Sequence, residues 1–346
     1  MGFFSANIVD WYKNFKRDLP WRNTTDPYKI WLSEIILQQT QVKQGLPYYK
    51  KFIATFPTVS DLATAQEEQI LKLWQGLGYY SRARNLHHAA KQINSNGTFP
   101  NSYEDILALK GVGEYTAAAI ASFAFKLSYA VVDGNVFRLL SRFYGINIPI
   151  NTSKGKKHFT ELAQSLLLKD QADLFNQAIM EFGSQMCKPK QPNCTQCPLQ
   201  TECKAFSESS IHLLPVKKGK VKVKNIYFDY FFFKANDYTV VKKRTSKGIW
   251  QNLYEFPLIE SEIQVSNEDI LKHQTFELWT KGQDFRVVSV SNFKHILSHR
   301  KIYARFWEID CINELPNSDS KKIKIQKIDT LAVSRLTEKF LETKIG

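Results

Sequence analysis

Long apolar runs are absent from this sequence of 346 residues. The first seventeen residues carry charges at amphipathic spacing, whereas an export signal needs an apolar stretch there. No other segment approaches the roughly 20 consecutive apolar residues of a membrane-spanning helix. Internal repeats and long low-complexity tracts are absent as well. We therefore expect a soluble, cytoplasmic protein with no export or targeting signal and no membrane association.

Acidic residues are scarce relative to basic ones. The chain has 33 Asp and Glu against 47 Lys and Arg, which gives a formal net charge of +14. Such a balance favours a polyanionic partner, most simply nucleic acid, and an anionic membrane surface is the alternative. With 43% hydrophobic and 13% aromatic residues, the chain has enough apolar side chains for packed cores, and its length predicts two domains.

The hydrophobic pattern changes along the chain. Up to about residue 205, apolar residues recur at helical spacing, as in Ile179, Phe182 and Met186. From Tyr227 onward, short runs rich in aromatic and β-branched residues are typical of strands. Between the helical and the strand-like patterns, five lysines fall within eight positions. The pattern predicts a mainly α domain over 1–206, a basic linker over 207–224 and an α+β domain over 225–346, with helices near 268–273 and 334–343.

Cysteine is rare, yet four of the five cysteines fall within seventeen residues in the pattern C-x6-C-x2-C-x5-C. They are Cys187, Cys194, Cys197 and Cys203. Thiolates are the ligands of soft metal centres, so this spacing indicates a zinc ion or an iron-sulfur cluster held by the loop 187–203. Disulfides would need an export signal, and chance clustering this tight is improbable. We interpret Cys311, outside the motif, as a buried thiol.

Two glycines flank one apolar residue between helical segments, at Gly111, Val112 and Gly113, directly after Lys110. A hairpin of this kind exposes backbone N–H groups at a helix N-terminus, where they suit a phosphate oxygen. The same residues also make an ordinary turn between two helices. The pattern alone leaves both interpretations open.

Two carboxyl groups are candidates for chemistry. Asp133 follows an apolar run and precedes a helical pattern, a place where Asp is an ordinary N-cap. Glu34 is surrounded by large apolar residues such as Trp31 and Ile35. Such surroundings disfavour the ionised form, so the carboxyl can stay a proton donor near neutral pH. A partnered glutamate on a helix surface is the alternative.

Longer motifs join the hairpin, the aspartate and the cysteine loop into one constellation. They lie at 19–22, 31–42, 76–82 and 132–136. With them, the sequence resembles the helix-hairpin-helix DNA glycosylase superfamily with an iron-sulfur loop, and within it the adenine glycosylases, over nearly the whole chain. The resemblance implies a mainly α helix-hairpin-helix glycosylase domain with a [4Fe-4S] loop, followed by an α+β Nudix-like domain. Zinc remains the alternative metal.

The resemblance implies a monofunctional enzyme that removes adenine opposite 8-oxoguanine or guanine from double-stranded DNA in base-excision repair. Tyr115 stands where bifunctional endonuclease III-like enzymes carry a Schiff-base lysine, and a phenol cannot form that imine. Glu34 would protonate N7 of the flipped base, and Asp133 would stabilise the sugar cation as a charge or by transient covalent capture. Asn135 would orient the carboxylate, the water or the sugar.

Further positions follow from the same resemblance. Arg22 and Glu181 would line the adenine pocket with Tyr115, although an ordinary surface ion pair or a capped helix end is their alternative interpretation. Gln39 and Tyr79 would insert into the duplex and offset the cost of extruding a base, although both residue types are also common as packed or capping residues in helical proteins. The other expected contacts, with the pocket wall or with DNA, are Trp21, Leu77, Lys110, Gly111, Val112 and Gly113.

The second domain carries its own signals. Residues 246–257 resemble the opening of the Nudix-like domain, but the sequence has no glutamate-rich box to hold magnesium, so we interpret the domain as a recognition module. Ser298 and His299 fall in the loop that inspects 8-oxoguanine in the family. Leu297 replaces the family's phenylalanine, which removes aromatic packing beside Ser298. An exposed or structural histidine is the alternative for His299.

Two other functions stay open at this point. A pyrimidine-lesion glycosylase with lyase activity is disfavoured by Tyr115 and by the second domain. A metal-stabilised mismatch binder that flips no base is disfavoured because both Glu34 and Asp133 are present. We expect a monomer acting on a single lesion, and the sequence does not identify contacts with replication or repair proteins.

Overall fold

The computed structural model describes residues 2–219, 223–281, 283–312, 314–316 and 320–345. The chain divides into two compact units. One comprises Met1–Thr64 and Asn85–Gly219, and the other comprises Ala65–Arg84 and Lys220–Gly346. The segment 65–84 therefore groups with the C-terminal residues, although it lies inside the helical stretch of the sequence. Residues 220–222 of the expected linker lie outside the described residues.

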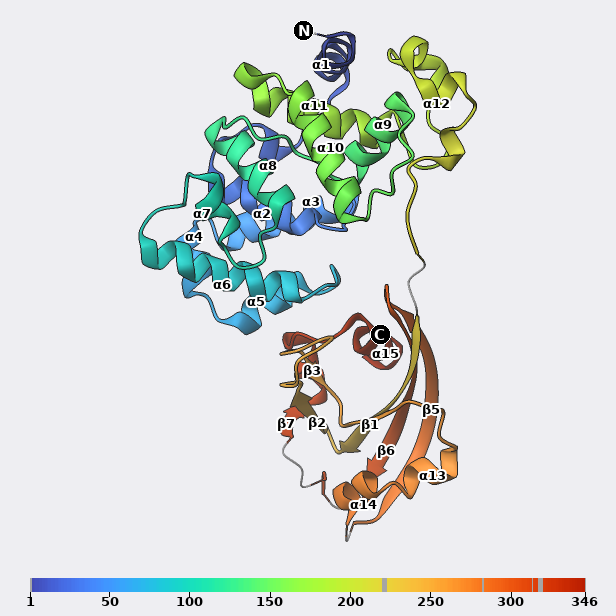
Figure 1. Cartoon of the computed structure of the whole chain (residues 1–346). Helices are drawn as coiled ribbons and strands as arrows, with labels where there is room; N and C mark the ends of the chain where they lie inside the picture. Colours follow the sequence, from blue (N-terminus) through green and yellow to red (C-terminus); the bar gives the residue numbers. More distant parts are fainter. Residues whose placement is uncertain (1, 220–222, 282, 313, 317–319, 346) are drawn as a thin grey trace. The chain divides into compact units, whose positions relative to one another are not determined.

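The first unit is helical, as the apolar spacing predicts (Figure 1). Its α-helices are α1 (Phe3–Phe15), α2 (Pro27–Leu37), α3 (Val42–Thr55), α4 (Val59–Thr64), α6 (Ser81–Asn96, which begins in the other unit), α7 (Tyr103–Leu107), α8 (Glu114–Phe125), α9 (Gly134–Tyr144), α10 (Ser153–Leu166), α11 (Ala172–Gln185) and α12 (Lys204–Ser207). A 3₁₀ turn spans Pro20–Arg22 before α2.

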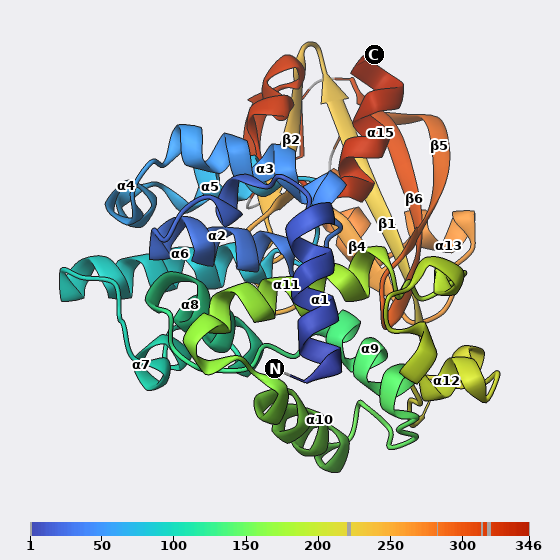
Figure 2. The same cartoon turned by 90° about the horizontal axis from the view of Figure 1, so that it is seen from above.

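Helix α11 is the centre of one core. Its residues Phe175, Ile179 and Phe182 recur at helical spacing and are almost fully buried. They pack with apolar residues of α1, α9 and α10, and α11 contacts α1, α8 and α9 (Figure 2). Burying each such phenylalanine contributes about 2 kcal/mol of transfer free energy. This packing holds α11 rigidly beside the start of α9.

The beginnings of four helices in the first unit are marked by short polar residues or glycine. Asp26 caps α2, because its side chain accepts hydrogen bonds from the backbone of Tyr28 and Lys29. Asp133 caps α9, as the sequence predicts for a helix start. Gly113 precedes α8, and Ser102 caps α7 as expected. Helices α7 and α8 pack together as a helix-hairpin-helix.

The second unit contains a mixed seven-stranded sheet of order β3-β2-β1-β6-β5, with β4 paired to β1 and β7 paired to β2. Strands β1 and β6 are parallel, with Tyr227 opposite Tyr303, and the other pairs are antiparallel. The strands are β1 (Lys224–Ala235), β2 (Tyr238–Lys243), β3 (Tyr254–Glu255), β4 (Leu258–Ser261), β5 (Phe285–Ile296), β6 (Arg300–Cys311) and β7 (Lys321–Lys324).

Neighbouring residues of β6 pack on opposite faces of this sheet. Trp307 clusters with residues of α13 (Asn267–Leu271) and α14 (Gln274–Thr280). Phe306 stacks on Phe340 of α15 (Arg335–Ile345), with ring centroids 4.4 Å apart. The helices expected near 268–273 and 334–343 are therefore present. Helix α5 (Glu67–Trp74) also belongs to this unit.

Within the described part of the chain, no helix is both long enough and apolar enough to cross a membrane.

Candidate active site

Glu34 and Tyr115 form a hydrogen-bonded pair between α2 and α8. The Tyr115 hydroxyl donates to Glu34 Oε2 over 2.7 Å. Glu34 is 5% exposed, since the surrounding apolar residues of α2 bury it as the sequence predicts. Burial raises the pKa of Glu34 from 4.5 to about 7, although the hydrogen bond from Tyr115 opposes the shift. This carboxyl can therefore give or take a proton near neutral pH.

Asp133 and Asn135 form the second polar pair, at the start of α9. Asp133 Oδ1 accepts hydrogen bonds from the backbone N–H groups of Asn135 and Val136, both over 2.8 Å. Asn135 Nδ2 donates to Asp133 Oδ2 over 2.6 Å. Burial raises the pKa of Asp133, while these three hydrogen bonds lower it. The carboxylate is thus oriented by its own helix end.

Arg138 links this pair to the cysteine loop. Its guanidinium donates to Asn135 Oδ1 over 2.9 Å and to the carbonyl oxygen of Gly183 over 2.6 Å. The same side chain donates through Nε to the carbonyl oxygen of Cys187 over 2.7 Å. Arg138 is 7% exposed, so these bonds lie in a protected interior.

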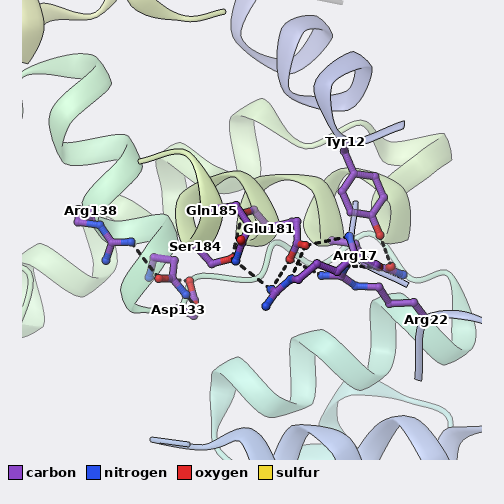
Figure 3. A network of polar contacts seen from close by, with 10 residues as sticks. Tyr12, Arg17, Arg22, Asp133, Arg138, Glu181, Ser184 and Gln185 are labelled. Atoms are coloured by element: carbon purple, nitrogen blue, oxygen red, sulfur yellow. Dashed lines mark hydrogen bonds and ion pairs between the residues drawn. The ribbon is translucent and has the colours of Figure 1, made fainter. Parts of the chain in front are cut away.

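Glu181 of α11 is the centre of a charged cluster (Figure 3). It is 1% exposed and accepts from Arg17 through the backbone N–H, Nε and Nη2, and from Arg22 through Nη2. Although burial opposes it, hydrogen bonding to the two arginines lowers the pKa of Glu181 to about 2. Arg22 and Glu181 therefore do pair, but in a buried cluster instead of the surface ion pair that is their alternative interpretation.

One cavity of about 170 Å³ brings these groups together. Its lining includes Glu34, Tyr115, Asp133, Asn135, Trp21, Arg17, Arg22 and Glu181. All of them belong to the first unit. A wider cavity of about 950 Å³ shares Asp133, Asn135 and Arg17 with the first and continues past Gln39, Lys43 and Lys217. The smaller pocket therefore adjoins a larger groove that is lined by basic residues.

The hairpin residues lie at the surface of the first unit. Lys110, Gly111 and Gly113 are exposed, and Val112 is half-buried. Gly111 has a φ of +82°, and a Cβ there would lie 2.6 Å from Cβ of Asn85. Only glycine meets both requirements without strain. The turn is therefore fixed in shape and leaves its backbone accessible.

Gln39 and Tyr79 share an unusual backbone conformation. Their φ angles are +55° and +48°, in the left-handed region that residues other than glycine seldom adopt. Both side chains are exposed, Tyr79 by 47%. Leu77, expected at the same surface, is only 6% exposed. Its side chain is therefore buried in this structure, and its contact with DNA stays a prediction.

Ser298 and His299 lie at the tip of the β5–β6 hairpin, and both are exposed. The hairpin is closed by the Leu297 N–H, which donates to the carbonyl oxygen of Arg300 over 2.8 Å. Within this unit, the hydroxyl groups of Tyr79 and Ser298 lie 2.7 Å apart and form a hydrogen bond. Tyr79 and Ser298, two of the expected contacts that fall in this unit, thus lie together.

The four cysteines of the loop, Cys187, Cys194, Cys197 and Cys203, are free thiols that line one small, largely apolar cavity. Arg142 closes one side, with its Nη1 atom 3.6 Å from Cys187 Sγ and hydrogen bonds to the carbonyl oxygens of Lys188 and Pro189. Across the described residues, no His, Cys, Asp or Glu side chains form a group of three arranged around a single metal ion. Four thiols with a nearby cation fit an anionic iron-sulfur cluster.

Sequence reasoning missed Arg17 and Arg138. Arg17 lies 164 positions from Glu181, and Arg138 lies 49 positions from Cys187. In the sequence, each arginine follows or interrupts an apolar pattern in the way a solvated residue does. A signal was present for Arg138, because it lies three residues after Asn135 on the same helix, the spacing at which side chains meet.

Comparison with known proteins supports these observations. Residues 32–165 match the HhH-GPD superfamily base excision DNA repair protein model, and residues 230–343 match the NUDIX domain model. An adenine DNA glycosylase of Buchnera aphidicola subsp. Baizongia pistaciae is 38% identical over 87% of this chain and 84% of its own length. Its counterpart in Buchnera aphidicola subsp. Acyrthosiphon pisum is 33% identical over 98% of this chain and 97% of its own length.

Solved structures agree on the helical unit. A thermostable thymine-DNA glycosylase matches with a TM-score of 0.55 and 31% identity over 59% of this chain and 95% of its own. A non-covalent endonuclease III–DNA complex matches with a TM-score of 0.52 over 60% of this chain and 98% of its own, at 20% identity. This match shows a shared fold. The two relatives from Buchnera extend the match through both units. The chain is therefore an N-glycosylase that belongs to the adenine DNA glycosylase family.

Proposed function

We propose that the enzyme is a monofunctional glycosylase that removes adenine opposite 8-oxoguanine, or opposite guanine, from double-stranded DNA. The observation that carries this proposal is the placement of Glu34, with a pKa of about 7, in the same cavity as Asp133. The names of the relatives, adenine DNA glycosylases, supply the base. The net charge of +14 and the basic groove favour DNA as the partner.

Glu34 acts as the general acid. Adenine is a poor leaving group as an anion, so proton transfer from Glu34 to N7 lets the base leave as neutral adenine when the C1′–N9 bond breaks. The electron pair of that bond goes to the base, and positive charge develops on the sugar. A pKa of about 7 leaves a large share of Glu34 protonated at neutral pH while keeping it acidic enough to donate.

Asp133 faces the developing sugar cation. Its ionised form is held by the hydrogen bonds from Asn135 and Val136, so its charge is already oriented before the bond breaks. It acts either as a fixed charge or by transient covalent capture, which are the two uses of a second carboxyl in glycosidases. Water then adds at C1′ and leaves an abasic site. Tyr115 offers no amine, so the strand stays intact.

Glu181 and its arginines line the same pocket as Glu34 and Asp133. The carboxylate accepts four hydrogen bonds, which is about the number of lone-pair sites it has. An adenine amino group can donate to Glu181 only if one arginine gives up its bond, which frees that arginine to donate to a ring nitrogen. The cluster therefore recognises a base that carries a donor beside an acceptor.

The exposed residues supply the contacts with the duplex. Gln39 and Tyr79 are the proposed wedges, since each projects from a strained, surface-exposed turn. Lys110 and the turn at Gly111 to Gly113 would hold a phosphate. In the second unit, Ser298 is proposed to inspect the purine opposite adenine, and its bond to Tyr79 holds the inspecting hydroxyl in place. His299 would contact the same strand.

The four cysteines would hold a [4Fe-4S] cluster. When bound, the cluster would fix the loop 187–203 and supply no step of the base-removal chemistry. Arg142 would offset its negative charge, because its guanidinium already lies beside Cys187 Sγ. Arg138 joins the backbone of Cys187 to Asn135, so an ordered loop also supports the catalytic pair.

Single-turnover base release tests the proposal. Duplexes with A opposite 8-oxoguanine, A opposite G and A opposite T are compared, and strand breaks are scored before and after alkali. A duplex with T opposite G is added, because one structural relative is a thymine-DNA glycosylase. Adenine release from the duplexes with A opposite 8-oxoguanine and A opposite G, with strand breaks that appear only after alkali, supports the proposal. Release of thymine alone, or cleavage without alkali, rejects it.

A further inference from the structure

We infer that Gly183 is a positioning residue for base removal. In this role it lets α11 approach the start of α9 closely enough to set the place of Asp133 relative to Glu181. The inference rests on the proposed function of Asp133. It adds a residue that touches neither base nor sugar but fixes the spacing between the two ends of the pocket.

The first observation is a contact with no room for a side chain. A Cβ built on Gly183 would lie 2.8 Å from the carbonyl oxygen of Asn135, and 3.0 Å from both its carbonyl carbon and its Cβ. Separations below 3.0 Å are essentially never seen for real Cβ atoms. Any larger residue at this position must therefore push the backbone of Asn135 away.

The second observation excludes a backbone reason for the glycine. Gly183 lies inside α11 and is absent from the positive-φ glycines. Alanine would be the better helix former at an interior helical position. Glycine at position 183 therefore makes the helix less stable than alanine would, and no unusual backbone conformation requires it. The close approach to Asn135 is the feature that requires it.

The third observation is that the contact joins both halves of the pocket. Glu181, at the base-binding end, lies two residues before Gly183 on the same helix. Asn135 is hydrogen-bonded to Asp133 through both its backbone and its side chain. Arg138 donates to the carbonyl oxygen of Gly183 and to Asn135 Oδ1, so it ties the two segments together at this point. Figure 3 shows Asp133 and Arg138 beside the helix that carries Glu181.

A methyl group at Gly183 would move the Asn135 backbone by several tenths of an ångström to restore ordinary contact. Asp133 would move with it, whereas Glu34 on α2 would not. Misplacement of a reacting group by about 1 Å can slow a reaction about 100-fold, so a shift of this smaller size predicts a rate about tenfold lower. The shift is confined to the start of α9 and leaves the proposed duplex contacts at Gln39 and Lys110 on other segments, so DNA affinity is expected to stay unchanged.

The experiment compares Gly183→Ala with Gly155→Ala. Gly155, in α10, is also crowded, since a Cβ there would lie 2.0 Å from the carbonyl oxygen of Pro149, but it lines neither described cavity of the pocket and groove. Three quantities are measured: the single-turnover rate of adenine release, the Kd for a duplex with a tetrahydrofuran abasic analogue opposite 8-oxoguanine, and the thermal midpoint. Gly155→Ala is expected to lower only the thermal midpoint.

Gly183→Ala is expected to lower the rate about tenfold with an unchanged Kd. The acid limb of its pH–rate profile should also move to higher pH, because weaker hydrogen bonds from Asn135 raise the pKa of Asp133. A merely destabilised protein would not shift that limb. If Gly183→Ala does not fold, Arg138→Lys tests the same junction, since it removes the bonds to Gly183 and Asn135 while keeping the charge. The same slower rate and shifted limb are expected.

A folded Gly183→Ala with the wild-type rate and pH profile would overturn the inference. If Gly183→Ala does not fold, a wild-type rate of adenine release in Arg138→Lys would overturn the inference instead. Failure of the proposed function looks different, because the wild-type enzyme would then release no adenine, or Asp133→Asn would keep the full rate. The two outcomes are therefore separated by the wild-type enzyme and Asp133→Asn assayed in parallel.

Discussion

The Tyr115 hydroxyl and Glu34 Oε2 lie 2.7 Å apart, and Glu34 is only 5% exposed. Burial alone would raise the pKa of Glu34 further, and the hydrogen bond from Tyr115 brings it back to about 7. The tyrosine thus tunes the strength of the acid that the proposed reaction uses. This relationship makes the pH dependence of the enzyme a sensitive measure of the site.

Tyr115→Phe is predicted to shift the alkaline limb of the pH–rate profile to higher pH. The hydroxyl stabilises the ionised form of Glu34, so its loss raises the pKa and keeps the acid protonated at higher pH. Single-turnover adenine release measured from about pH 5 to about pH 10, a range that brackets the Glu34 pKa of about 7, locates the limb. An unmoved or lowered limb would contradict the assignment of Glu34 as the acid.

Glu34→Gln is predicted to abolish base release and to stabilise the protein at alkaline pH. The pKa of Glu34 is raised from 4.5 to about 7 in the folded state, so its contribution to stability is fully present below pH 4.5 and is lost as pH rises through 7. Glutamine avoids this loss, which amounts to about 3 kcal/mol at most. Urea unfolding of both proteins at pH 5 and 8.5 tests the prediction. Equal stability differences at the two pH values would refute it.

Glu181→Gln is predicted to destabilise the first unit by about 2 kcal/mol, because the buried carboxylate accepts hydrogen bonds from two charged arginines. The pKa of Glu181 is lowered to about 2, so its contribution is present above pH 4.5 and is lost as pH falls toward 2. The difference between wild type and variant should shrink on acidification. A pH-independent difference in urea midpoint would show that the ion pairs contribute little.

Cys197→Ser is predicted to lower bound iron and to weaken DNA binding, since it removes one of the four thiols around the cavity. Cys311→Ser is the matched control, because that buried thiol lies on β6, outside the cavity. Iron analysis and duplex affinity are measured on each purified protein. Equal iron content in Cys197→Ser and Cys311→Ser would argue against the assignment of the loop.

Ser298→Ala is predicted to reduce the rate advantage of A opposite 8-oxoguanine over A opposite G, because it removes the hydroxyl that Tyr79 orients. Leu297→Phe is predicted to increase that advantage by restoring an aromatic side chain beside Ser298. The ratio of the single-turnover rates on the two duplexes, measured for each variant and for the wild type, tests both predictions. If neither substitution changes the ratio, the hairpin does not read the lesion.

The local parts of the site were accessible from the sequence, and the long-range parts were not. The apolar neighbours of Glu34 on its own helix predicted its burial, and the pattern after Asp133 predicted its helix start, because both effects act within a few residues. The partners of Glu181 come from the segment before α2, more than 150 positions away, so no local pattern marks Arg17. The close approach at Gly183 likewise exists only once α11 packs against α9.

The grouping of residues 65–84 with the C-terminal residues shows the same limit. Helix α5 has ordinary amphipathic spacing and gives no sign in sequence of what it packs against. In the structure, Gln75 just after α5 hydrogen-bonds to Glu338 of α15 over 2.8 Å. Helical periodicity predicts that a helix exists and which face is buried, but it does not identify the partner.

The saturated carboxylate of Glu181 has a consequence for how the enzyme rejects bases. Two arginines donate all four hydrogen bonds that Glu181 accepts, so under the proposed function a base enters by exchanging partners with an arginine. A base that cannot replace the bond it breaks leaves a buried charge unpaired and is returned to the helix. Selectivity would then reside in the stability of the empty pocket: the better the arginines hold Glu181, the fewer wrong bases can stay.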